Sequence, residues 1–194
     1  MPRDWNKAYE DGDTPWDKGY ASPPLAEFLH RRRIEGRALV PGCGTGHDVR
    51  LLAAHGAEVV GMDIAPRALH EAETFPRSGR ERYVLGDFLR ASEEHLSAYE
   101  WVVEHTCLCA IKPCDRDAYA EALNRVLKPG AYFLAVFFRE VNRDSNDGPP
   151  FAINHEESNA LFSGRFELLD AYVPTETYPS RPIGSEEVTL WRLK

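Results

Sequence analysis

Three glycines at alternate positions restrict what this chain can fold into, because they separate a strand-like run from a helix-like run. Residues 37–40 are typical of a short buried strand, and residues 49–54 have the composition of a helix. Gly42, Gly44 and Gly46 lie between the two runs. Glycine lets a ligand approach the backbone closely, and the free N–H groups at a helix start bind polar ligand atoms. The segment therefore predicts a strand–turn–helix unit with a ligand at the turn.

The spacing of these glycines distinguishes between two kinds of nucleotide site. Dinucleotide-binding turns carry the pattern G-x-G-x-x-G, whereas residues 42–46 read G-x-G-x-G. The difference of one residue points away from NAD and toward S-adenosylmethionine. An NAD-dependent oxidoreductase is accordingly the least favoured of the functions considered.

Downstream of this unit, strand-like and helix-like runs continue to alternate. Short, continuous apolar strands separated by helices indicate an α/β fold, with a parallel sheet covered on both faces. Further strands are expected at residues 58–62, 83–85, 101–103 and 132–138, and further helices at residues 23–33, 66–74 and 116–127.

After residue 138 the pattern changes. Residues 139–150 are polar and rich in Pro and Gly, which predicts a long surface loop, and a helix is expected at residues 156–162. Two late strands, at residues 166–172 and 188–193, have no helix between them. We therefore predict an antiparallel hairpin at one edge of the sheet.

Composition and charge limit the partners and the cellular location. The 194 residues suit one domain, in which residues 1–20 form a polar arm that carries aromatic side chains. No apolar run approaches the ~20 residues that span a bilayer, and the N-terminus has no signal-peptide pattern, so a cytoplasmic protein is expected. The net charge of −8, without a basic stripe, argues against nucleic acid and anionic membranes as partners. We expect a monomer or weak homo-oligomer that acts on a small molecule.

The four cysteines are Cys43, Cys107, Cys109 and Cys114. Three of them crowd into one apolar segment, which is a poor layout for a disulfide framework. Residues 107–109 form C-x-C, and no second pair lies at a zinc-finger distance. Buried, reduced thiols are therefore expected, and no metal site.

Polar side chains follow successive strands at the edge where open α/β sheets bind their ligands. Asp63 ends the second strand, where a carboxylate can accept hydrogen bonds from both ribose hydroxyls. After the third strand, Asp87 can accept from an adenine amino group while Phe88 packs on the ring. Residues 104–106, which include His105, follow the fourth strand. Each is commonplace alone, but together and in this order they favour a nucleoside site.

The sequence GRALVPGCGTGHDV at residues 36–49 resembles the first motif of the halide/thiol and thiopurine S-methyltransferase family, and its plant-type halide/thiol branch in particular. Other segments are similar to that branch in the same order along the chain. They are residues 5–9 and 14–19 in the arm, CAIKP at 109–113, and GPPF at 148–151. The resemblance therefore covers nearly the whole chain.

The resemblance implies a Rossmann-like class I methyltransferase fold with a seven-stranded, mostly parallel sheet. It also implies S-adenosyl-L-methionine as cofactor, S-adenosyl-L-homocysteine as product, and an arm that folds over the cofactor as a lid. By motif position, the cofactor-binding residues are Trp5, Tyr9, Trp16, Gly42, Gly44, Asp63, Ile64, Asp87, Phe88 and His105. Tyr9 stands where the family commonly has tryptophan. A second interpretation of the arm is that its aromatic side chains only anchor the terminus.

His105 stands where the plant-type proteins usually carry a tyrosine beside the reaction centre. One interpretation is that it fills the same volume and hydrogen-bonds the cofactor carboxylate. The other is that it acts as a general base, for which Tyr20 and Tyr178 are weaker candidates. Arg139, just past the last central strand, either steers an anion toward the site or is an ordinary solvated arginine.

These expectations describe a methyltransferase of class EC 2.1.1. The acceptor would be a small soft nucleophile: a thiol, hydrogen sulfide, thiocyanate, a halide, or a related selenium or tellurium species. Two alternatives stay open. One is a thiopurine-type enzyme with a larger acceptor, and the other is a regulator that binds S-adenosylmethionine without catalysis.

Overall fold

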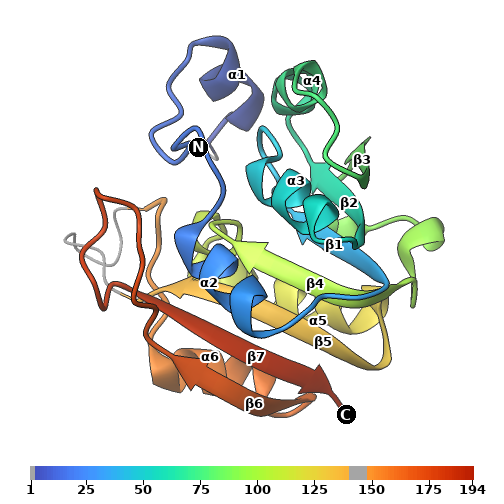
Figure 1. Ribbon diagram of the computed structural model, residues 1–194. Coiled ribbons are helices and arrows are strands. Elements are labelled where there is room, and N and C mark those ends of the chain that lie inside the picture. Colours follow the sequence, from blue (N-terminus) through green and yellow to red (C-terminus); the bar gives the residue numbers. More distant parts are fainter. Residues whose placement is uncertain (1–2, 140–147) are drawn as a thin grey trace.

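The computed structural model describes residues 3–139 and 148–194, and a seven-stranded sheet forms its centre. The strand order is β3-β2-β1-β4-β5-β7-β6 (Figure 1). The strands are β1 (Arg37–Pro41), β2 (Glu58–Asp63), β3 (Arg80–Leu85), β4 (Tyr99–His105), β5 (Leu127–Phe138), β6 (Phe166–Tyr172) and β7 (Glu186–Leu193). Strands β1 to β5 pair in parallel, and β7 pairs antiparallel with both β5 and β6. The predicted mostly parallel sheet with an antiparallel hairpin at one edge is confirmed.

Six α-helices surround the sheet in the described ranges. They are α1 (Trp5–Glu10), α2 (Pro23–Arg31), α3 (His47–Ala54), α4 (Pro66–Thr74), α5 (Arg116–Val126) and α6 (His155–Phe162). In Figure 1, α2 and α3 lie in front of the sheet, whereas α5 and α6 lie behind it. The two faces have separate apolar clusters, one containing Phe28 and Leu52 and the other containing Tyr119 and Phe162. Burial on both faces explains why the inner strands read as continuous apolar runs.

The sequence misplaces several element boundaries. The arm contains the short helix α1, which begins after Asp4 because the Asp4 carboxylate accepts a hydrogen bond from the Lys7 N–H at 3.0 Å. The helix predicted at 116–127 ends at Val126, because Leu127 already pairs with Tyr99 as the start of β5. Helix α2 ends at Arg31, two residues before the predicted end. Most of the loop predicted at 139–150 falls on residues 140–147, which lie outside the described residues.

The topology determines where a ligand can bind. Strand β1 lies between β2 and β4, so the strand order reverses beside it. The glycine turn after β1 therefore shares one edge of the sheet with the ends of β2 and β4, where Asp63 and His105 stand. No helix in the described ranges is long and apolar enough to cross a membrane.

Candidate functional site

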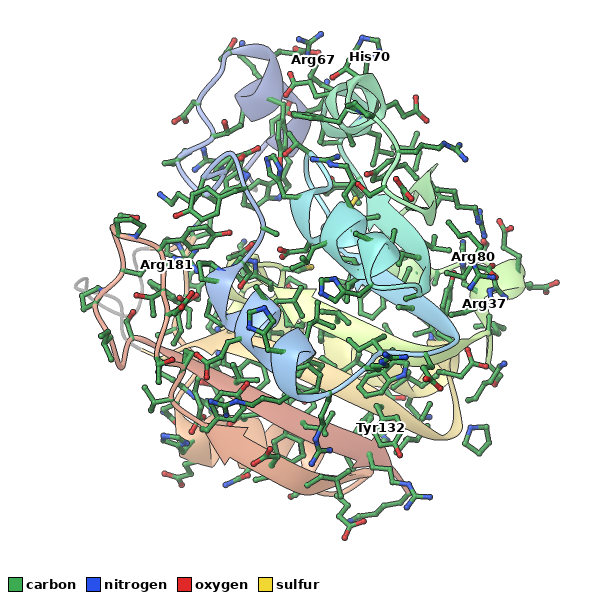
Figure 2. The ribbon with its side chains drawn as sticks, viewed as in Figure 1. Arg37, Arg67, His70, Arg80, Tyr132 and Arg181 are labelled. Atoms are coloured by element: carbon green, nitrogen blue, oxygen red, sulfur yellow. The ribbon has the colours of Figure 1, made fainter. Side chains whose placement is uncertain are left out.

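A cavity of about 1010 Å³ lies at this edge of the sheet. It is enclosed by the N-terminal arm, the glycine turn, the ends of β2 to β5 and the connection between β6 and β7. Figure 2 shows Arg181 toward this edge, with Arg37 and Arg80 at the opposite side of the molecule. All ten residues that the resemblance assigns to the cofactor line this one cavity: Trp5, Tyr9, Trp16, Gly42, Gly44, Asp63, Ile64, Asp87, Phe88 and His105.

The glycine turn is packed too closely for side chains. Gly42 and Gly44 have φ of +57° and +54°, which L side chains rarely adopt. A Cβ on Gly42 would lie 2.9 Å from the sulfur of Cys107, and one on Gly44 would lie 2.7 Å from the Tyr9 hydroxyl. The turn therefore touches both the arm and the segment after β4, and only glycine fits between them.

Asp63 fixes the glycine turn to the end of β2. Its Oδ2 accepts a hydrogen bond from the Gly44 N–H at 2.8 Å, and its Oδ1 accepts one from the Ala65 N–H at 2.9 Å. The side chain lines the cavity although the residue is only 7% exposed, and this burial raises the pKa of Asp63. Each carboxylate oxygen retains a lone pair that a ligand hydroxyl can use.

The residues after β3 place a polar side chain, Asp87, next to an apolar one, Phe88. Asp87 accepts a hydrogen bond from the Leu89 N–H at 2.9 Å and keeps an exposed carboxylate oxygen beside the cavity. Phe88 is buried, with its ring centroid 4.9 Å from that of Tyr119. The pair presents a hydrogen-bond acceptor next to a fixed aromatic ring, as the adenine end of a nucleoside requires.

The arm lies over the cavity as a cluster of aromatic rings. The Trp16 indole N–H donates to the Tyr9 hydroxyl at 3.0 Å, and the rings of Trp5 and Trp16 meet edge to face at 5.3 Å. The guanidinium of Arg3 lies 4.6 Å from the centre of the Trp16 ring. The cluster packs on Ala65 and Ala68. The aromatic residues of this cluster therefore line the cavity in addition to anchoring the terminus.

Asp17 ties the arm to the glycine turn. Its carboxylate accepts a hydrogen bond from the Thr45 hydroxyl at 2.6 Å and contacts Nε2 of His47 at 3.2 Å. The hydrogen bond with His47 holds the pKa of Asp17 well below its usual range. Asp17 is therefore ionised near neutral pH, and its contacts with Thr45 and His47 hold the arm against the glycine turn.

At the other end of the cavity, both ring nitrogens of His105 have partners. Nδ1 lies 2.7 Å from Oδ2 of Asp48, and Nε2 lies 3.1 Å from Nη1 of Arg181. A guanidinium can only donate, so Nε2 accepts and Nδ1 carries the proton that is donated to Asp48. The ring also stacks on Tyr178, with 5.9 Å between centroids and 19° between planes. In this arrangement, His105 is a neutral imidazole in one defined tautomer.

Arg181 provides the cationic group that faces this end of the cavity. Its guanidinium lies 5.1 Å from the ring centres of both Phe138 and Tyr178, and it forms an ion pair with the buried Glu186. The sequence interpretation missed Arg181 because the connection between β6 and β7 has no periodic pattern. It also treated Asp48 only as part of the glycine motif.

Arg139 is not brought to the cavity, which corrects its expected role as the residue that steers an anion. Its Nε donates to Glu187 at 2.9 Å, and its Nη1 donates to the Ile153 carbonyl at 2.9 Å and the Ser158 hydroxyl at 3.1 Å. It is therefore a buried structural cation and not a solvated one. Tyr178 lines the cavity, but burial raises its pKa and its hydroxyl donates to the Tyr20 carbonyl, so it is a poor base.

A buried carboxylate supports the segment after β4. Glu104 accepts hydrogen bonds from the N–H groups of Cys107 and Leu108 and from the Tyr119 hydroxyl, at 3.1, 2.9 and 2.7 Å. Cys107 and Cys109 line the cavity, and burial raises the pKa of Cys109 to about 12. Because these thiols stay protonated, they serve as soft walls and not as nucleophiles.

Comparisons with known proteins agree with this geometry. The family model for thiopurine S-methyltransferase matches residues 1–189. A probable thiol methyltransferase 2 from Arabidopsis thaliana is 31% identical over 194 residues, covering 97% of this chain and 84% of the relative. A thiocyanate methyltransferase 1 from Brassica oleracea is 36% identical over 154 residues, covering 77% of this chain and 66% of the relative. The fold is similar to that of 1,6-didemethyltoxoflavin-N1-methyltransferase from Burkholderia thailandensis, solved with S-adenosylhomocysteine, at 20% identity and a TM-score of 0.74, covering 97% of this chain and 84% of that one.

Proposed function

Because the chain belongs to the thiopurine S-methyltransferase family and is an S-adenosylmethionine-dependent methyltransferase, we propose that its acceptor is a small soft nucleophile. The acceptors that we consider are small thiols, hydrogen sulfide, thiocyanate and halides. The observation that carries the proposal is the position of the Arg181 guanidinium, which lies 5.1 Å from the ring centres of Phe138 and Tyr178 and 3.1 Å from Nε2 of His105. A cation there stabilises the negative charge that a thiol sulfur develops as it loses its proton.

The residues at the end of the cavity that contains the glycine turn fit the cofactor. The glycine turn leaves the backbone open to close approach, and Asp63 and Asp87 offer carboxylate oxygens where a nucleoside requires acceptors. The faces of Trp5 and Trp16 suit a positively charged sulfur, since aromatic faces attract cations. When bound, S-adenosylmethionine supplies an activated methyl group. The contribution of the chain is to align the acceptor behind that group and to exclude water.

The acceptor end has soft and largely apolar walls. The thiol of Cys109 and the rings of Phe138, Phe151 and Tyr178 line it, together with the guanidinium of Arg181. Polarisable walls that include a guanidinium suit a small sulfur nucleophile better than a strongly hydrated oxygen anion. We assign the role of stabilising the negative charge on the acceptor sulfur to Arg181 instead of Arg139.

The proposal is tested by incubating the purified protein with methyl-labelled S-adenosylmethionine and iodide, thiocyanate, hydrosulfide, 2-mercaptoethanol or 6-mercaptopurine. We expect methylated product from hydrosulfide and 2-mercaptoethanol, with kcat/KM at least about tenfold above that for 6-mercaptopurine. Binding of the cofactor without any methylated product would instead indicate a regulator. A preference for 6-mercaptopurine would indicate a thiopurine-type enzyme.

The lid role of the arm leads to a second prediction. Trp16→Ala removes a ring that lines the cavity and should weaken S-adenosylmethionine binding by about 1 kcal/mol, roughly fivefold in Kd. The matched variant Trp16→Phe keeps an aromatic face and loses only the hydrogen bond to Tyr9, so it should bind more tightly than Trp16→Ala. Isothermal titration calorimetry measures both affinities. Unchanged affinity in Trp16→Ala would mean that the arm only anchors the terminus.

A further inference from the structure

The negative and positive charges around His105 are not equal in number. Asp48 on α3 and Glu186 on β7 are carboxylates, whereas Arg181 is the cation among these partners. With a neutral ring at His105, this four-residue group carries one net negative charge. Tyr178 stacks on the ring as a neutral phenol, and Glu104, the adjacent residue on β4, points to the other face and is held by Tyr119.

This charge favours an acceptor that arrives with a proton. A preformed anion would add a second negative charge to a group that is already negative. A neutral thiol adds none, and when its proton moves to the ring, the four-residue group becomes neutral. The one net negative charge of this four-residue group therefore balances the one positive charge that a sulfonium carries.

We propose that Asp48 and Glu186 act as positioning residues that set this charge, so that the neutral form of a thiol binds and delivers its proton to Nε2 of His105. The proposal rests on the methyl transfer proposed above and adds the protonation state of the acceptor to it. Asp48 holds the Nδ1–H tautomer, which leaves the Nε2 lone pair as an acceptor. In this structure the lone pair accepts from Nη1 of Arg181 at 3.1 Å, and the S–H of the thiol takes the place of that donor when it binds. Glu186 lies 3.8 Å from Nε2 and can attract the imidazolium N–H after the transfer.

The step balances in atoms and electrons. The S–H bond of the acceptor breaks, its proton passes to Nε2 of His105, and its electron pair stays on sulfur. That sulfur forms the new S–CH3 bond while the bond between the methyl group and the sulfonium breaks. The released pair stays on the cofactor sulfur, which becomes the neutral thioether of S-adenosylhomocysteine. The proton on His105 is lost to water when the products leave.

The first test compares pH profiles for a thiol and for iodide, which has no proton to give. A proton taken up by this four-residue group favours an anion and disfavours proton transfer from a thiol, so the two values of kcat/KM should change in opposite directions with pH. Between pH 5.5 and pH 8.5 we expect the ratio of 2-mercaptoethanol to iodide kcat/KM to rise by about tenfold or more, after correction for the ionisation of the thiol. Parallel profiles for the two acceptors would overturn the proposal.

The variant Asp48→Asn tests the positioning role. The carboxamide oxygen introduced by this change can still accept the hydrogen bond that Asp48 Oδ1 receives from the Ser22 N–H at 2.7 Å, but the carboxamide NH2 would donate to Nδ1 of His105. The ring would then carry its proton on Nε2 and lose its function as an acceptor. We expect kcat/KM for the thiol to fall about 100-fold and that for iodide to fall less than about fivefold. Equal losses for both acceptors would overturn the role of Asp48.

A spectroscopic measurement reads the tautomer without cofactor or turnover. Nitrogen-15 NMR of the histidine rings, with His105 identified by its absence in His105→Gln, should show Nδ1–H in the wild type and Nε2–H in Asp48→Asn. A wild-type Nε2–H tautomer would overturn the proposal even if Asp48→Asn does not fold.

Glu94→Gln is the matched control, since Glu94 lies 3.8 Å from the ring of another histidine, His95, outside the cavity. It should change neither pH profile. Loss of the opposite pH trends in Glu94→Gln would show that they do not arise at His105, and would overturn the proposal. Absence of methyl transfer to every acceptor would instead contradict the proposed function.

Discussion

Gly46→Ala is expected to lower the free energy of unfolding by about 3 kcal/mol. Gly46 precedes α3 with φ of +76°, a conformation that costs an L side chain about 1–2 kcal/mol. An added Cβ would also lie 2.6 Å from Cε1 of Tyr83, so the ring would have to move at a further cost of about 1–3 kcal/mol. Displacing Tyr83 would break its hydrogen bond with Arg50, which also donates to the Thr45 carbonyl in the glycine turn.

Chemical denaturation monitored by circular dichroism measures this loss. Gly56→Ala is the matched control because Gly56 lies at the other end of α3, with φ of +98° and nothing within 4 Å of an added Cβ. The control carries only the backbone cost, so we expect a loss of about 1–2 kcal/mol. If Gly46→Ala lost no more than Gly56→Ala, the contact with Tyr83 would not constrain the turn.

Local patterns were sufficient to predict most of the fold. Continuous apolar runs such as residues 58–62 mark strands buried on both faces, and Pro66 correctly marks the start of a helix. The boundaries that were wrong depend on contacts between distant residues. Residue 127 belongs to β5 because it pairs with Tyr99, and no feature of residues 116–130 alone reports that pairing.

The two ends of the cavity differ in how far the sequence predicts them. Around the glycine turn, Asp63 and the Asp87–Phe88 pair lie at or just after the ends of β2 and β3, so position in the chain already gives position at the sheet edge. At the acceptor end, His105 meets Asp48 across 57 residues and Arg181 across 76 residues. Such pairs arise only when the sheet assembles, and no local pattern in the sequence reports them.

The position of Arg139 shows that a residue next to a strand end does not necessarily point into the cavity. Successive strand residues point to opposite faces of a sheet. Phe138, the last residue of β5, lines the cavity, and the next residue, Arg139, points away to Glu187. A shift of one residue therefore exchanges a place in the cavity wall for a structural ion pair.

Asp63→Ala is expected to weaken binding of S-adenosylhomocysteine about 100-fold, which corresponds to about 2.7 kcal/mol. Hydrogen bonds to a carboxylate contribute about 1.5–3 kcal/mol each, and a ribose has two hydroxyls that can donate to the Asp63 carboxylate. The variant would also remove the acceptor of the Gly44 N–H, leaving the glycine turn less ordered. Asp87→Ala is the matched control, since its carboxylate is far more exposed and should contribute less. Isothermal titration calorimetry provides both affinities.

The pH dependence of binding distinguishes a ribose contact from a merely structural role of Asp63. Burial raises the pKa of Asp63, so its protonated fraction grows as the pH falls from neutrality toward that raised value. Ligand hydroxyls donate to the ionised carboxylate, so binding favours the ionised form and releases a proton wherever the free site is partly protonated. The affinity for S-adenosylhomocysteine should therefore decrease as the pH is lowered, with proton release visible as a binding enthalpy that depends on the buffer. Asp63→Asn, which cannot ionise, should lose both effects, and their persistence in that variant would show that another group carries them.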